Sequence, residues 1–436
     1  MRDRRPHLSG TQGLVEPQTT SVRDRLAALL RSILPGVFLF GFCIGTGSVT
    51  AMATAGAEYG MALLWTVLLS CLITFYLIDL FGRFTLVTGE TALAAFRRHM
   101  HPAVGYFFIV ALTAHVCGSV IGVMGILSDV LSEWSGSILG VRIPPVGFAV
   151  FFITVVYLLF LDGRTKVFQQ ALAAIVAVMS VCFLVNLLFV APPPADILRG
   201  LVPRVPETVD GRSAFLVIAS MVGTTVFSGL FILRGSLVRD AGWTMAEYGT
   251  QRRDAAFAAA MMFLVSAAIM AAGAGTLHAQ GLRLNNVSEM ITLLRPVAGT
   301  FAVGIFVMGI VAAGVSSQFP NVTLLPWMLN DYYGRRASMR RTDYRLIVLG
   351  ISLLGLLVPV LGGRPILVMM VSQAFGAIVL PVTVACLLVV GNRRSLMREH
   401  AFGIVTNTLL GLTLAFALTM SWMSYRGLLA TLNWLL

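Results

Sequence analysis

The chain has 436 residues, of which 57% are hydrophobic and only 11% are charged, and its mean hydropathy is +0.87. This composition excludes a water-soluble globular domain, because repeated apolar runs of about 20 residues indicate bilayer spans. The formal net charge of +12 does not indicate nucleic-acid binding, since most basic residues lie in short segments between apolar runs. We therefore expect a lipid bilayer, and no nucleic acid, as the partner of this chain.

The first 32 residues are polar and rich in Arg, and we expect them to form a tail without packed structure. Eleven apolar segments follow, and each is long enough to cross a bilayer as a helix, the only open segment that satisfies its backbone there. The expected spans are 33–56, 59–82, 104–131, 145–161, 168–191, 213–238, 255–280, 299–329, 345–362, 365–390 and 403–425.

The distribution of Lys and Arg predicts the orientation of these spans. Most of the 31 basic residues fall in the tail and in every second loop, for example at 83–98, 335–345 and 393–398. Loops that face the cytoplasm carry the excess of Lys and Arg. We expect a multi-pass protein of a bacterial inner (plasma) membrane, with its N-terminus in the cytoplasm and its C-terminus outside.

A proline-rich outer segment divides the chain. It covers 192–212 and separates a first half at 33–191 from a second half at 213–390, each with five spans. Residues 391–436 then supply a loop and an eleventh helix. The tail at 1–32 completes this expected organisation.

Two of the spans contain an interruption at corresponding places in the two halves. The first is Gly45-Thr46-Gly47-Ser48, and the second is Phe227-Ser228-Gly229. Broken helices in corresponding halves of a membrane protein indicate the substrate site of a secondary transporter. We therefore expect these residues to bind substrate. Neither interruption contains a carboxylate.

Several segments, in order and spacing, resemble the natural resistance-associated macrophage protein (NRAMP) family of divalent-metal transporters over nearly the whole chain. They are Leu34-Pro35-Gly36, Ala55 to Gly60, Leu63-Leu64-Trp65, Arg83 to Gly89, Ala312 to Ser317, Ser372-Gln373, Leu380-Pro381 and Arg393 to Met397. The resemblance implies an all-α integral membrane protein of the leucine-transporter type. That fold has two inverted five-helix repeats, broken helices 1 and 6, and alternating access.

The functional residues of that family carry over poorly. Its first-helix signature Asp-Pro-Gly-Asn falls on Gly45 to Ser48, and its sixth-helix Met-Pro-His falls on Phe227 to Gly229. A second sixth-helix histidine falls on Arg234, and the acidic pair of the third helix falls near Val116 and Ser119, beside His115. Only the tenth-helix glutamine has a clear counterpart, Gln373, which we also expect to bind substrate. The resemblance thus implies a transporter whose metal site is altered.

The altered breaks favour an anion over a transition metal. A dehydrated Mn or Fe ion at the bilayer midplane needs anionic or soft ligands, and the hydroxyls of Thr46, Ser48 and Ser228 are weak substitutes. The start of a half-helix exposes N–H groups that bind anions. The leading expectation is therefore a small anion such as bicarbonate, and no metal ligand is assigned.

Three residues outside the breaks are candidates for coupling or charge. Arg234 either faces the substrate or extends toward Asp240 at the membrane surface, since a charge in a span is usually functional or paired. His115 is either a hydrogen-bonded core residue or a proton carrier, with Ser119 one turn further along. The acids and histidines of the family's proton path are mostly absent, so the coupling ion, H⁺ or Na⁺, stays open.

Other functions remain as alternatives. A polar neutral or zwitterionic solute fits the same hydroxyls and amides. A divalent cation of the Mg type would have to cross partly hydrated, because Mg²⁺ sheds water reluctantly. A transport-inactive sensor could keep the fold without the flux. We expect neither an enzyme nor a cofactor, because the sequence contains no catalytic triad pattern, phosphate-binding loop or metal-ligand spacing.

Overall fold

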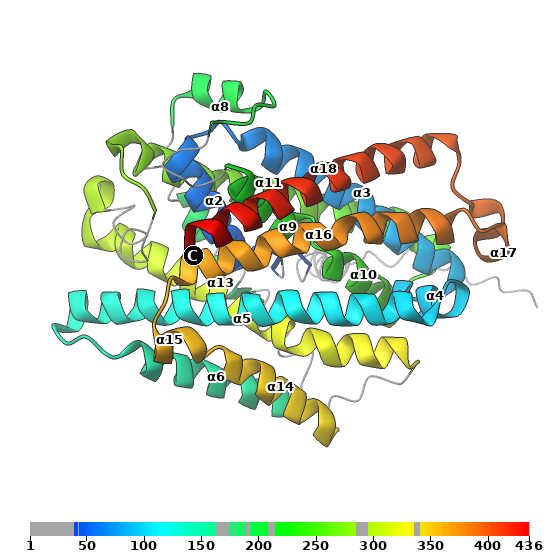
Figure 1. Cartoon of the computed structure of the whole chain (residues 1–436), viewed down its shortest axis with the longest axis horizontal. Helices are drawn as coiled ribbons and strands as arrows, with labels where there is room; N and C mark the ends of the chain where they lie inside the picture. Colours follow the sequence, from blue (N-terminus) through cyan, green and yellow to red (C-terminus); the bar gives the residue numbers. More distant parts are fainter. Residues whose placement is uncertain are drawn as a thin grey trace, which may run out of the picture.

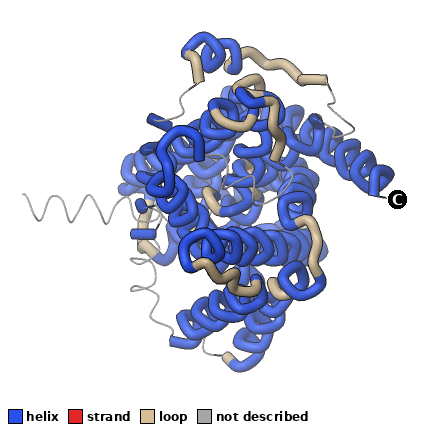
Figure 2. Tube along the Cα trace, turned by 90° about the vertical axis from the view of Figure 1, so that its left-hand side faces the viewer, coloured by secondary structure: helices blue, strands red, loops and turns tan. Residues whose placement is uncertain are grey.

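The computed structural model describes residues 39–41, 43–162, 174–175, 177–178, 180–185, 187–188, 192–207, 214–284, 295–334 and 341–435; at 295–303, 305–306 and 435 it describes only the backbone. These residues form helices joined by loops and contain no strand (Figure 2). The expected tail at 1–32 and half of the fifth expected span, 168–191, lie outside the described residues.

Within the described ranges, eight helical segments are long and apolar enough to cross a bilayer. They are α3 (Leu64–Thr88), α5 (Pro102–Leu139), α9 with α10 (Ala214–Thr225 and Ser228–Asp240), α11 (Tyr248–Gly275), α13 (Arg295–Tyr332), α14 with α15 (Thr342–Leu354 and Leu357–Leu361), α16 (Pro365–Gly391) and α18 (Ile404–Leu435). Each coincides with an expected span. The total of eleven spans stays a prediction.

Shorter elements complete the described chain. They are α2 (Thr46–Tyr59), α4 (Ala92–His99), α6 (Pro145–Asp162), α8 (Pro194–Gly200), α17 (Arg394–Met397) and the 3₁₀ turns η1 (Met245–Glu247), η2 (His278–Gln280) and η3 (Arg398–His400). Helix α8 falls in the expected joint at 192–212. The division into two repeats and the orientation in the membrane stay predictions.

The long helices run side by side along the long axis of the molecule, and α16 occupies a central place among them (Figure 1). It packs against α5, α9 and α18, while α2 packs against α9 and α11. Both broken helices, with α2 after one break and α9 before the other, therefore lie inside the bundle. Most buried apolar side chains join in one continuous core.

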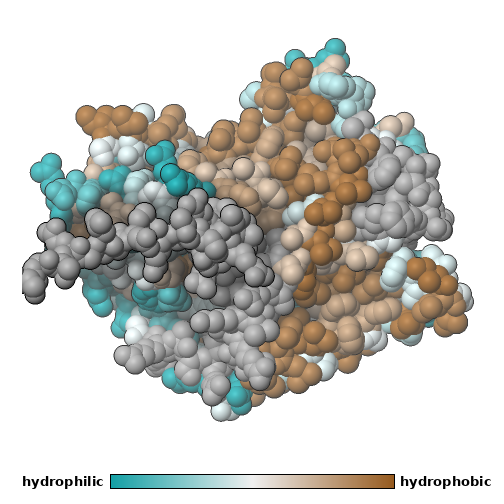
Figure 3. Space-filling view, turned by 180° about the vertical axis from the view of Figure 1, so that it is seen from behind, coloured by the Kyte–Doolittle hydropathy of each residue, from teal (hydrophilic) through white to brown (hydrophobic). Residues whose placement is uncertain are grey.

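The outer surface is apolar where a lipid-facing surface is required. Large side chains face outward on α5, α14 and α18; for example, Val110 is 68% exposed and Leu346 and Leu412 are each 64% exposed. Figure 3 shows apolar residues over much of the surface seen from behind, with hydrophilic residues gathered mainly toward one end. Such an apolar surface is untypical of a soluble monomer and suits contact with lipid. The chain is a multi-pass membrane protein.

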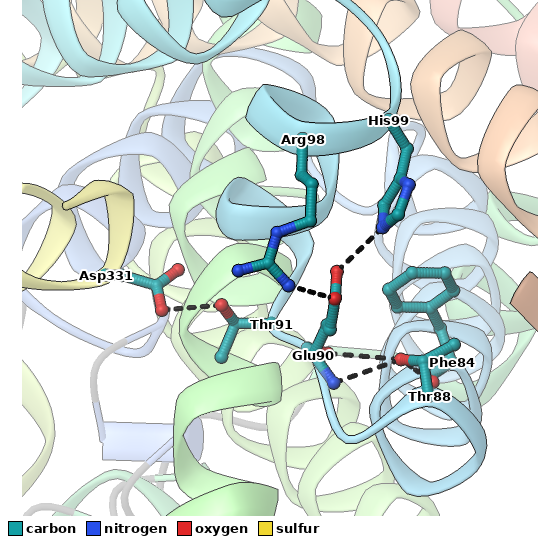
Figure 4. Close-up of polar contacts among 7 residues, drawn as sticks. All are labelled: Phe84, Thr88, Glu90, Thr91, Arg98, His99 and Asp331. Atoms are coloured by element: carbon teal, nitrogen blue, oxygen red, sulfur yellow. Dashed lines mark hydrogen bonds and ion pairs between the residues drawn. The ribbon is translucent and has the colours of Figure 1, made fainter. Parts of the chain in front are cut away.

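Polar contacts hold the end of α3, helix α4 and the end of α13 together (Figure 4). We call this group the α4 cluster, and its members are Glu90, Thr91, Arg98, His99 and Asp331. The Glu90 carboxylate accepts a hydrogen bond from Arg98 and pairs with His99 Nε2 at 3.0 Å. Thr91 Oγ1 donates to Asp331 Oδ1 at 2.5 Å, and Arg239 of α10 contacts the same oxygen at 3.4 Å. Helices from distant parts of the chain are thus tied at one end of the bundle.

Candidate substrate site at two helix breaks

The first break lies immediately before α2. Ile44 and Gly45 are not helical, and α2 begins at Thr46 with Gly45 as its N-cap residue. The glycine pattern predicted an unwound segment from Gly45 to Ser48, but Thr46, Gly47 and Ser48 form the first turn of α2. Gly47 serves packing instead, because a Cβ atom at this position would lie only 2.5 Å from Gln373 Nε2. Gln373 of α16 therefore lies directly against the start of α2.

The second break separates α9 from α10 at Val226 and Phe227. The last carbonyl groups of a helix lack partners within that helix and need other donors inside a bilayer. Cys43 Sγ donates to the Thr224 carbonyl at 3.3 Å, and Thr74 Oγ1 donates to the Thr225 carbonyl at 2.8 Å. Side chains from the first half of the chain thus allow α9 to end in the middle of the bundle.

A hydrogen bond joins the two breaks directly. Ser48 Oγ donates to the Cys43 carbonyl at 2.7 Å and lies 2.9 Å from Thr224 Oγ1. Because Ser48 donates its only hydroxyl proton to the Cys43 carbonyl, Thr224 Oγ1 is the donor in the hydrogen bond to Ser48 Oγ. All three side chains are buried. Sequence reasoning missed Thr224, although a hydroxyl in the last turn before a break was the available signal.

The start of α10 is held by two further contacts. Thr383 Oγ1 of α16 donates to Ser228 Oγ at 2.7 Å. The Phe227 ring stacks on the His115 imidazole of α5, with centroids 4.6 Å apart and planes inclined by 26°. Gly229 lies under the same ring, since a Cβ atom there would lie 2.5 Å from a Phe227 ring carbon. The structure therefore brings His115 to the second break.

The polar groups around His115 come from α5, α13 and α16. Ser372 Oγ donates to the His115 carbonyl at 2.9 Å, and Asn321 Nδ2 donates to Ser119 Oγ at 3.0 Å. The His115 Nδ1 atom is buried and has no hydrogen-bond partner among the described residues. Ser119 thus lies one turn from His115 but bonds to a different helix. Their role in coupling stays a prediction.

Arg234 is placed differently from the other site candidates. Its guanidinium pairs with Asp254 of α11 at 2.6 Å and donates to the Gln251 carbonyl at 3.2 Å. Both charged side chains are almost completely buried, and the Trp243 ring lies 5.7 Å from the guanidinium carbon. The positive charge of Arg234 is therefore balanced within the protein, by Asp254 and not by Asp240.

The two breaks present hydroxyl, carbonyl, amide and aromatic groups. Within the described ranges, no group of three or more His, Cys, Asp or Glu side chains is arranged to hold a metal ion. The hydroxyl and amide oxygen atoms at the breaks come from Ser48, Thr224 and Gln373, beside the Cys43 thiol and the His115 imidazole. Hard oxygen ligands suit Mg²⁺, Ca²⁺ or Mn²⁺ better than softer metals.

Known proteins resemble this chain in sequence and in fold. The family model for natural resistance-associated macrophage protein-like proteins matches residues 37–425. The divalent metal cation transporter MntH of Acidiphilium cryptum is 26% identical over 406 residues, covering 88% of this chain and 89% of the relative. The MntH of a Nostoc species is 25% identical over 383 residues, covering 84% of each chain.

The structure of a manganese transporter from Eremococcus coleocola has the same fold, with a TM-score of 0.73 at 16% identity, covering 94% of this chain and 88% of that one. This likeness confirms the expected all-α fold of the leucine-transporter type, and the two broken helices are those described above. Since the family model spans most of the sequence, the chain belongs to the natural resistance-associated macrophage protein-like family of membrane transporters, and it is not an enzyme.

Proposed function

We propose that this chain is a secondary transporter that carries a divalent metal cation across the membrane by alternating access. The observation that carries the proposal is the pair of breaks joined through Ser48 and Thr224, in a chain whose relatives are named divalent metal cation transporters. Those names favour a metal cation over the small anion that the sequence suggested. The cation would bind between the two breaks.

The donor atoms define which cation fits. Ser48 and Thr224 supply hydroxyl oxygens, Gln373 supplies an amide oxygen, and the neighbouring backbone supplies carbonyls. Mg²⁺ keeps several of its waters when it binds to proteins, so a site without carboxylates can still hold it partly hydrated. Mn²⁺ also accepts oxygen ligands. We therefore expect weak, hard-ion selectivity, with Mg²⁺ and Mn²⁺ preferred over softer ions such as Zn²⁺.

Binding at this site requires the bond between Ser48 and Thr224 to open. In the described conformation the Ser48 proton is directed to the Cys43 carbonyl, and the Thr224 proton is directed to Ser48. A cation would replace the Thr224 proton on the Ser48 oxygen. Substitution of either hydroxyl should therefore weaken uptake without removing a charged group from the protein.

Uptake into proteoliposomes tests this proposal. We expect saturable uptake of Mn²⁺ and Mg²⁺ by the unchanged protein, and a clear loss of uptake in Ser48→Ala and Thr224→Val. Ser128→Ala is a matched control, because Ser128 is equally buried in α5 and donates only to the Met124 and Gly125 carbonyls of its own helix. Uptake no greater than in protein-free liposomes would contradict the proposal.

A small anion such as bicarbonate is the second candidate. It is favoured by the N-termini of α2 and α10, which begin at the breaks, receive no side-chain cap and have no acidic residue in the first turn. Uncapped helix N-termini attract anions. Labelled bicarbonate in the same proteoliposomes separates the two candidates, since bicarbonate uptake without metal uptake would establish the anion. Absence of both fluxes in a folded protein would indicate a sensor.

A further inference from the structure

A polar cavity lies at the edge of the bundle, away from both breaks. Its volume is about 580 Å³, and it lies between helix α8 and the loop that joins α2 to α3. The end of α11 and the turn η2 form a further wall. Figure 1 shows α8 at the upper edge of the bundle, above α2. The lining residues that the structure describes do not include any residue of the proposed substrate site.

The walls of this cavity are held by close packing and hydrogen bonds. The backbone of Gly200 in α8 packs on the Met61 carbonyl, since a Cβ atom on Gly200 would lie 2.1 Å from that oxygen. Trp65 Nε1 donates to the Arg204 carbonyl at 3.0 Å. On the other wall, His278 Nδ1 donates to a carbonyl of α2 at 3.2 Å. The segment from 194 to 204 is therefore fixed against the ends of α2 and α3.

The cavity lies at the level where the head groups of a bilayer are expected. Two helices meet there, because α2 ends at Tyr59 and α3 begins at Leu64. Trp65 follows in the first turn of α3. Trp and Tyr side chains are enriched where membrane-spanning helices reach the interface with water. A lipid head group can therefore reach the cavity from the surrounding bilayer.

The segment of α8 also exposes apolar side chains that have no explanation in the packing of the bundle. They are Leu198 (68% exposed), Leu201 (36%), Val202 (51%) and Val205 (51%). A short amphipathic segment that exposes apolar residues binds at the boundary between head groups and acyl chains. Lipid chains would cover these side chains.

The charged residues that line the cavity carry a net positive charge. Among the described residues they are Arg199, Arg204 and Asp196, so one positive charge remains with His278 counted as neutral. Arg199 Nη1 lies 3.8 Å from Asp196 Oδ1, too far for a hydrogen bond. The contact of Arg204 with Trp65 uses the backbone carbonyl and leaves the guanidinium for a ligand. Guanidinium groups bind phosphate oxygens with paired hydrogen bonds.

We propose that this cavity binds the head group of an anionic phospholipid. Arg199 and Arg204 bind the phosphate, and the acyl chains lie against the apolar side chains of the α8 segment. A lipid such as phosphatidylglycerol carries one negative charge, which balances the net charge of the cavity. Basic pockets between membrane-spanning helices bind lipid head groups. Inorganic phosphate shares the charge but lacks the chains, so the test has to separate the two.

A bound lipid would stabilise the end of α2 in the described position. Helix α2 already packs closely on α11, since a Cβ atom on Gly56 would lie 2.1 Å from the Met270 carbonyl oxygen. Because α2 begins at the first break, a lipid at its other end would also stabilise the arrangement of the substrate site. Only this consequence rests on the proposed function. The lipid site itself can be tested without any transported substrate.

The unfolding temperature of the purified full-length protein, in detergent without lipid, tests the site. We expect a saturable rise on addition of phosphatidylglycerol, and no comparable rise with phosphatidylcholine or inorganic phosphate. Arg204→Gln should raise the phosphatidylglycerol concentration that gives half of the rise by about tenfold, the effect of losing one hydrogen bond between charged groups. Arg199→Gln combined with Arg204→Gln should abolish the rise.

Arg426→Gln is the matched control. Arg426 is also an exposed arginine in a membrane-spanning helix, but it lies on α18 against the Trp422 ring and does not line the cavity. This variant should respond to phosphatidylglycerol as the unchanged protein does. A full rise in the combined variant, or an equal rise with phosphatidylcholine, would overturn the lipid site. An equal rise with inorganic phosphate would also overturn it, because the chains would then contribute nothing.

The same preparations separate this inference from the proposed function. Metal uptake by a protein whose unfolding temperature does not respond to phosphatidylglycerol would leave the proposed function intact and defeat only the lipid site. A rise specific to phosphatidylglycerol in a protein without metal uptake would do the reverse.

Discussion

The buried pair of Arg234 and Asp254 should contribute to the stability of the fold and not to transport. Its two charged atoms are 2.6 Å apart, and the side chains are 0% and 1% exposed. Arg234 gains one further acceptor in the Gln251 carbonyl. The perturbation is a cycle of three variants: Asp254→Leu, Arg234→Met, and the two substitutions combined.

The expected magnitudes follow from burial. Removing one partner of a buried ion pair leaves the other charge uncompensated and costs about 3–5 kcal/mol of unfolding free energy. Asp254→Leu should show this full cost, because the Arg234 guanidinium has no exposed route to water. Replacing both partners with apolar residues of similar volume is often neutral or stabilising. The combined variant should therefore be much more stable than either single variant.

The assay is unfolding in detergent, followed by tryptophan fluorescence, because Trp243 lies beside the guanidinium of Arg234. Metal uptake is measured on the same three variants. If the combined variant unfolds as readily as Asp254→Leu, the reasoning about the uncompensated charge is wrong. If it is stable but takes up no metal, Arg234 acts in transport and its pairing is not merely structural.

Three further predictions concern the breaks and the α4 cluster. Gly47→Ala should lower the unfolding temperature because its Cβ atom would collide with Gln373 Nε2, and adding Gln373→Ala should recover part of that loss. Thr74→Val should lower the unfolding free energy by about 1 kcal/mol, since the buried Thr225 carbonyl of α9 loses its stronger donor and keeps only the Cys43 thiol at 3.4 Å. Ser70→Ala, at a hydroxyl without a partner among the described residues, should not lower it. Asp331→Asn should weaken the α4 cluster by about 1 kcal/mol, measured as a lower unfolding temperature, and an unchanged temperature would show that its contacts contribute nothing.

The breaks could be placed from the sequence to within two or three residues. Glycine and serine in otherwise apolar spans predicted both, and the structure has them at Ile44–Gly45 and Val226–Phe227. The prediction extended too far because Gly47 and Gly229 are helical. Their missing side chains make room for Gln373 and for the Phe227 ring. Sequence alone does not distinguish a glycine that unwinds a helix from one that permits close packing.

Hydrogen-bond and ion-pair partners that lie on different helices could not be predicted from the sequence. In the sequence, Thr224 is one of several hydroxyl residues in an apolar segment. Its hydrogen bond to Ser48 forms because α2 packs against α9. Arg234 left two interpretations open because its partner, Asp254, follows twenty residues later across a loop. The spacing of residues within one helix predicts local pairs. It does not predict pairs that depend on how two helices are turned toward each other.

The bond between Ser48 and Thr224 also has a kinetic consequence. After each delivery, a carrier has to return across the membrane empty, through a closed state without cargo. Unpaired polar atoms buried in that state would raise its free energy, since a buried hydroxyl without a partner is costly. Ser48, Thr224 and the Cys43 carbonyl satisfy one another when nothing is bound. We therefore expect these bonds to lower the affinity for cargo and to speed the empty return.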